Sequence, residues 1–102
     1  MRLSVGMRLK GSADDTQVIV VKAPAGEVEV TCGGHPLVAL DADVHEQLPL
    51  ADGHTGPTLL GKRYADDGVG IELLCTKAGA GALFVNGSPL GAKATKPLPS
   101  SD

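Results

Sequence analysis

The sequence predicts an all-β protein, a small sandwich or barrel of about seven to eight short antiparallel strands with little helix and an extended C-terminal tail. Apolar residues recur with a period of two, which is the side-chain period of a strand. Turn-forming residues separate the apolar segments, and 14 glycines supply the positive backbone φ that tight turns need. A chain of 102 residues corresponds to one domain.

Strict alternation along residues 2–10 predicts the first strand. The β-branched run in residues 17–22 predicts a strand covered on both faces, because it contains no polar alternation. The turn-forming segment 23–26 and the alternating segment 27–32 follow, so residues 17–32 are expected to form a β-hairpin. A short strand is expected at 36–40. The first strand would turn four residues towards the core: Leu3, Val5, Met7 and Leu9.

Residues 41–57 interrupt the strand pattern with acidic, histidine and proline residues. We expect a long surface loop there, with one helical turn between Asp43 and Glu46. Strand character returns in residues 58–64 and 70–75, and the intervening turn predicts a second hairpin.

Residues 82–85 lead into Asn86-Gly87, the strongest short-range signal for a hairpin. Residues 92–102 have no apolar period and are expected to form an extended tail. The predicted organisation is therefore a single β domain over residues 1–91, followed by that tail.

The composition argues against nucleic-acid binding. Tyr64 and Phe84 are the only aromatic residues, so the chain lacks the stacking platforms that hold single-stranded bases. A net charge of −3 is also unsuited to a phosphate backbone.

The sequence predicts a cytoplasmic protein without a membrane segment. The basic start is not followed by the apolar stretch of a secretory signal. The longest aliphatic run, Val18–Val21, is far shorter than the roughly 20 residues of a membrane helix. Two cysteines without a secretory signal are expected to be free thiols rather than a disulfide.

Cysteine and histidine spacing suggests one possible zinc or iron site. Cys32 and His35 have the spacing of one knuckle of a zinc ribbon, and Cys75 could supply a third ligand. A closed site would need a fourth ligand, for which Asp15, His45 and His54 are candidates.

Two alternatives to a metal site remain open for the cysteines. Cys32 and Cys75 share the parity of apolar neighbours, as expected of small buried core residues. Cys32 could instead be a reactive thiol, although no positive cluster or helix N-terminus is evident to lower its pKa.

The segments VIVVKAPAGEVEVTCGGHPL, LLGKRY, LLCTKAGAGAL and KPLP resemble a family of short uncharacterised actinobacterial proteins with a CGG-P and LCTKAG pattern. The resemblance covers most of residues 8–100 and brings no activity with it. It implies a cysteine at the position of Asp15 and a small residue at that of His35. The chain departs from the family there, which weakens a shared thiolate site, although Asp15 could still ligate through oxygen.

The densest positive segment is Lys62-Arg63 beside Tyr64, a combination that suits contact with a partner. Alternatively, this segment is an edge strand protected by its charges. No convergent set of catalytic residues is evident, so we expect no catalytic activity from the chain alone. The function favoured is a small β interaction module, an accessory protein or small subunit docking on a larger enzyme, with a protein partner or a homo-oligomer as its assembly. The alternative is a zinc- or iron-binding protein using Cys32, His35 and Cys75.

Overall fold

Every strand pair in the computed structural model is antiparallel, and the residues it describes, 2–12, 14–42 and 49–93, contain no helix. The all-β prediction is confirmed, and the described residues form twelve strands, several of them only two or three residues long. The strands are β1 (Arg8–Lys10), β2 (Gln17–Lys22), β3 (Val30–Cys32), β4 (His35–Pro36), β5 (Val38–Ala39), β6 (Thr55–Thr58), β7 (Arg63–Asp66), β8 (Ile71–Lys77), β9 (Gly79–Gly81), β10 (Leu83–Val85), β11 (Ser88–Pro89) and β12 (Gly91–Lys93).

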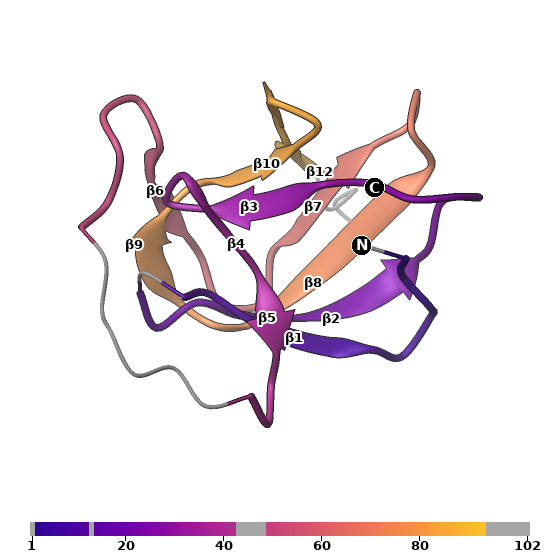
Figure 1. The fold of residues 1–102 in the computed structure, drawn as a ribbon, viewed down its shortest axis with the longest axis horizontal. Helices are drawn as coiled ribbons and strands as arrows, with labels where there is room; N and C mark the ends of the chain where they lie inside the picture. The colour runs from indigo at the N-terminus through magenta and orange to yellow at the C-terminus, as the bar shows by residue number, and fades with distance from the viewer. Residues whose placement is uncertain (1, 13, 43–48, 94–102) are drawn as a thin grey trace, which may run out of the picture.

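The strands form two main sheets and a small one. The six-stranded sheet has the order β12-β7-β8-β2-β1-β5, and the four-stranded sheet has the order β11-β10-β3-β4. A two-stranded sheet pairs β6 with β9. In Figure 1, β3 and β10 lie above β8 and β2, so the two main sheets face each other across the core.

The core between the sheets is aliphatic. Val18, Leu73 and Cys75 point into it from the six-stranded sheet, and Val30 and Cys32 from the four-stranded sheet. In the part of the chain that the structure describes, fifteen buried residues form a single cluster, in which Tyr64 is the aromatic member. Because branched aliphatic side chains fill the space, the sheets need no large aromatic residue to close the core.

The chain passes from one main sheet to the other within a single extended segment. β4 belongs to the four-stranded sheet and β5 to the six-stranded sheet, with Leu37 between them. The Leu37 side chain is buried, and its N–H donates to the carbonyl of Val30 at 3.1 Å. The strand predicted over residues 36–40 is therefore two short strands joined at a corner.

Two predicted hairpins are present, although the strand predicted over residues 58–64 is wrong for most of its length, because β7 begins only at Arg63. β7 pairs with β8 around the turn at Asp66, and β10 pairs with β11 around Asn86-Gly87. Asn86 and Gly87 have φ values of +50° and +84°, as a two-residue hairpin turn requires. The Asn86 side chain also accepts the N–H of Glu29 at 2.9 Å, which ties this turn to the segment before β3.

The strand predicted over residues 2–10 is wrong for most of its length. Gly6 has a φ of +91°, and the N–H of Met7 donates to the Ser4 carbonyl at 3.0 Å, so a turn interrupts the strand. Leu3 and Leu9 are buried as expected, but Val5, at the turn, is 70% exposed. Only β1 remains as a strand of that segment.

The hairpin predicted over residues 17–32 is also wrong. β2 exists over the predicted residues, but it pairs with β1 and β8 in the six-stranded sheet. β3 pairs with β10 and β4 in the other main sheet. The turn-forming segment 23–26 therefore leads from one main sheet to the other and does not return the chain beside β2.

The long loop predicted over residues 41–57 contains the start of β6, which pairs with β9. The helical turn expected between 43 and 46 lies outside the described residues.

Near the C-terminus, β12 pairs with β7 and crosses the predicted boundary between domain and tail at residue 91. Residues 94–102 also lie outside the described part of the chain.

The hairpin turn at Asn86-Gly87 generates a stability prediction. Gly87→Ala places a Cβ in the left-handed region, with no atom within 4 Å to clash with it. We expect the free energy of unfolding to fall by about 1–2 kcal/mol from backbone strain alone, measured by urea denaturation. Gly91→Ala is the control, because Gly91 has equally open surroundings and an ordinary φ. Equal effects in the two variants would contradict the prediction.

Candidate functional site

Cys32 ends β3 at a glycine hairpin and lies inside the protein. Gly33 and Gly34 have φ values of +66° and +88°, and they return the chain so that His35 pairs with Cys32. The Cys32 side chain is fully buried, and its Sγ donates to Asp14 Oδ1 at 3.6 Å. The Cys-Gly-Gly-His segment is therefore a strand corner with a buried thiol.

The Asp14 carboxylate is the centre of this region. It accepts the Thr16 hydroxyl at 2.6 Å, the Gly81 N–H at 2.7 Å and the Thr16 N–H at 3.2 Å. Thr16 is fully buried, and a Cβ on Gly79 would collide with its hydroxyl and with the Asp14 carboxylate. These bonds join the turn between β1 and β2 to β9 and hold the Cys32 thiol beside them.

The sequence predicted Asp15, the neighbour of Asp14, as the carboxylate that could act beside the cysteines. Asp15 is exposed, whereas Asp14 reaches the thiol. The available signal was Asp14-Asp15-Thr16 between two strands, because an aspartate commonly accepts the N–H two residues later in such a turn. Gly79 and Gly81 leave room for this carboxylate.

Burial raises the pKa of the Cys32 thiol to about 12. The nearby Thr16 side chain lowers this pKa, but the negative charge and hydrogen bonding of Asp14 raise it further. Burial also raises the pKa of Cys75, whose Sγ donates to the Lys77 carbonyl at 3.1 Å. Both groups are protonated thiols at neutral pH, the environment of core cysteines rather than of nucleophiles.

Two of the predicted metal ligands, His35 and Asp15, have other surroundings than a shared metal site. His35 Nε2 lies 2.8 Å from the Pro49 carbonyl oxygen, and Asp15 points to solvent. Within the described ranges, no group of three or more His, Cys, Asp or Glu side chains is placed to hold a metal ion. Zinc or iron binding remains a prediction that these contacts do not support.

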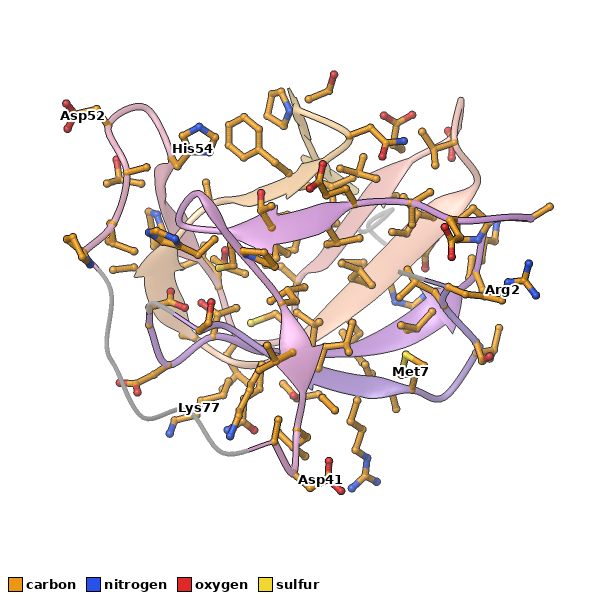
Figure 2. All side chains as sticks on the ribbon, viewed as in Figure 1. Arg2, Met7, Asp41, Asp52, His54 and Lys77 are labelled. Atoms are coloured by element: carbon orange, nitrogen blue, oxygen red, sulfur yellow. The ribbon has the colours of Figure 1, made fainter. Side chains whose placement is uncertain are left out.

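The two remaining histidines were candidates for a fourth ligand. His54 packs on Phe84 with 4.2 Å between the ring centroids, and its buried Nδ1 has no hydrogen-bond partner in the described structure (Figure 2). His45 lies outside the described residues. No contact among the described residues places His54 beside Cys32.

A second candidate site is the turn that precedes β7, residues 59–62, which we call the leucine turn. The N–H of Lys62 donates to the Leu59 carbonyl at 3.2 Å, and Gly61 has a φ of +80°. Backbone bonds of 2.9 Å and 3.0 Å join Gly61 and Lys62 to Cys75 in β8. The Leu59 N–H donates to the Tyr64 hydroxyl at 2.8 Å. The turn is thus held at both ends.

The leucine turn exposes its two apolar side chains. Leu59 is 45% exposed and Leu60 67% exposed, and with Val5 they are the exposed large hydrophobic residues of the described chain. Lys62 and Arg63 beside them are exposed, although Arg63 pairs with Glu72 at 3.4 Å. Tyr64, predicted as a contact residue, is buried and positions the turn from inside. β7 lies between β8 and β12, so the edge-strand interpretation is wrong.

Comparison with known proteins identifies no relative of this chain. No protein-family model, curated protein sequence or solved structure matches this chain. The described residues also contain no helix with the length and apolar character needed to cross a bilayer.

The hydrogen bonds of Asp14 provide a stability prediction. Asp14→Ala removes the acceptor for Gly81 and Thr16 and leaves their donors without it. We expect the free energy of unfolding to fall by about 3 kcal/mol. Asp15→Ala, one residue away and exposed, should change it by no more than about 0.5 kcal/mol. Comparable losses in the two variants would show that Asp14 has no special role.

The thiol pKa predicts slow alkylation of the native protein. With a pKa of about 12 instead of 9.0, Cys32 holds about a thousandfold less thiolate at neutral pH than an ordinary cysteine. In a Cys75→Ala variant, iodoacetamide should label Cys32 slowly in the folded protein and rapidly in urea, as followed by mass spectrometry. Rapid labelling of the folded variant would restore the reactive-thiol hypothesis.

Proposed function

We propose that the protein is a small β interaction module, an accessory protein or small subunit that docks on a larger enzyme through the leucine turn. The observation that supports this proposal most directly is the exposure of Leu59 and Leu60 on a turn whose backbone is hydrogen-bonded on both sides. Exposed leucines on a frayed segment would support docking less strongly, because the free-energy cost of ordering that segment would weaken binding.

Burial of these leucines would stabilise a complex. Moving a leucine side chain from water into an apolar contact contributes about 1.5–3 kcal/mol. The entropy cost of ordering the turn is largely met before binding, since Gly61, Lys62 and Tyr64 already hold it. A small, rigid apolar protrusion fits an apolar pocket on a partner.

The charges beside the leucines indicate the character of that pocket. Lys62 and Arg63 are exposed, and the Arg63 side chain keeps 57% exposure despite its ion pair with Glu72. A partner pocket bordered by carboxylates would complement them and orient the encounter. The proposed partner surface is thus an apolar pocket with an acidic rim.

This proposal predicts that Leu60→Asp releases the partner. A tagged chain would be crosslinked in cells, and the recovered proteins quantified by mass spectrometry. We expect recovery of the specific partner to fall at least about tenfold, because loss of leucine burial and introduction of a carboxylate both oppose binding.

Val5→Asp is the matched control, because Val5 is 70% exposed and Leu60 67% exposed, and the two lie in different turns. The control should retain the partner. Equal recovery with all three chains, or a strictly monomeric species in native mass spectrometry of extracts, would contradict docking. Concentration-dependent self-association lost in Leu60→Asp would replace the larger partner with a second copy.

A further inference from the structure

The outer face of the six-stranded sheet carries a row of aligned residues that the core does not use. Arg8 in β1 pairs with Ile19 in β2, and Ile19 pairs with Leu74 in β8. Leu74 in turn pairs with Arg63 in β7. Directly paired residues of neighbouring antiparallel strands lie on the same face of a sheet. The row therefore has an arginine at each end and two half-buried aliphatic residues between them.

The same face is rich in positive charge, although the chain as a whole has a net charge of −3. Five of the nine lysine and arginine residues lie at paired positions of β1, β2, β8 and β7 on this face. Among the described strands, Glu72 is the acidic residue at these positions. Charge is thus segregated, with a cationic sheet face on an acidic protein. The five cations are Arg8, Lys10, Lys22, Arg63 and Lys77.

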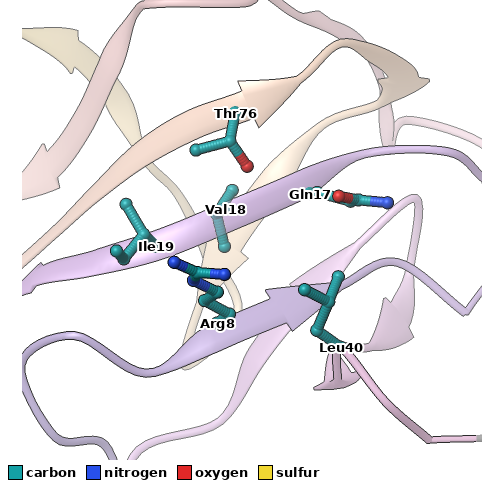
Figure 3. Close-up of a pocket in the computed structure, with 6 residues that line it drawn as sticks. All are labelled: Arg8, Gln17, Val18, Ile19, Leu40 and Thr76. Atoms are coloured by element: carbon teal, nitrogen blue, oxygen red, sulfur yellow. The ribbon is translucent and has the colours of Figure 1, made fainter.

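A pocket of about 280 Å³ opens at the Arg8 end of the row (Figure 3). Figure 3 shows Arg8 and Leu40 on one side of the β2 segment and Thr76 on the other. The polar lining comes from Arg8, Gln17 and Thr76, and the side chains of all three lack hydrogen-bond partners in the described part of the structure. Ile19 and Leu40 add aliphatic surface. The lining suits a carboxylate carried on a short aliphatic stem.

The carboxylate that follows the pocket residue Leu40 does not neutralise Arg8. Asp41 is exposed, and no ion pair joins it to Arg8 within the described residues. The Arg8 guanidinium is thus available to an incoming anion, and an arginine binds a carboxylate in a paired geometry.

We propose that this outer face binds an extended acidic segment of the partner, with one carboxylate in the pocket beside Arg8 and a second beside Arg63. The inference rests on the proposed docking function and names the chemistry of the partner. The leucine turn directly precedes Arg63 in β7, so both surfaces would meet the same partner.

The spacing of the row sets the spacing of the acidic residues. Arg8 and Arg63 are separated by three strand intervals, about 14 Å in all, because neighbouring strands lie about 4.8 Å apart. In an extended segment, every second residue faces the same side, and four residues span about 13 Å. Acidic residues four apart, with an apolar residue midway facing Ile19 and Leu74, match the row.

The test uses the complete chain and a synthetic peptide, acetyl-Glu-Thr-Leu-Thr-Glu-amide, as the probe. Titration would be followed by amide chemical shifts in NMR. We expect saturable shifts confined to the residues of the row and of the pocket. A peptide of the same composition with adjacent carboxylates, acetyl-Glu-Glu-Leu-Thr-Thr-amide, should bind several-fold more weakly.

Arg8→Glu is the decisive variant, because Arg8 makes no ion pair within the described ranges whose loss would unfold the sheet. It should weaken peptide binding at least about tenfold without changing the thermal unfolding midpoint. Arg2→Glu makes the same charge change at an exposed site outside the row and should leave binding unchanged.

Three results would overturn the inference: no saturable shifts at millimolar peptide, equal weakening by Arg2→Glu, or tighter binding of a short oligothymidylate at the same amides. The last result would assign the face to phosphate chains. Failure here, with partner loss still caused by Leu60→Asp, would leave the docking proposal standing and remove only the acidic segment.

Discussion

The hydrogen bonds of the Asp14 carboxylate are the interaction on which the arrangement of this domain depends. Three donors converge on it from Thr16 and Gly81, which lie far apart in the sequence. A partly buried carboxylate is stabilised when its oxygens accept hydrogen bonds, as both oxygens of Asp14 do. The approach of β9 to this centre requires glycine at 79 and 81, because a Cβ at either position would meet Thr16, Asp14 or Cys32.

Much of the fold could be predicted because side-chain alternation and turn chemistry are local. The hairpin at Asn86-Gly87 and the β7–β8 pair both follow from residues adjacent in sequence. Pairing between distant strands could not be predicted in this way. The segment 17–32 has every local feature of a hairpin, yet β2 and β3 join different sheets. Gly6 likewise interrupts an alternation that was otherwise regular.

The candidate sites could be predicted only in part, because they too depend on contacts between residues that are distant in sequence. Lys62 and Arg63 stood out as a charge cluster, but the exposure of Leu59 and Leu60 depends on a turn closed by Tyr64 and β8. Asp14 and Asp15 are indistinguishable by composition, and only the direction of the turn decides which reaches the Cys32 thiol. The row from Arg8 to Arg63 draws on four strands, so no window of sequence contains it.

The corner at Leu37 has a mechanical consequence. A single residue connects β4 in one main sheet to β5 in the other, and that residue is itself buried and bonded to Val30. A covalent tether this short permits almost no sliding of one layer over the other. Load applied to either layer is therefore transmitted through the backbone to its neighbour, and the sandwich responds as one stiff body.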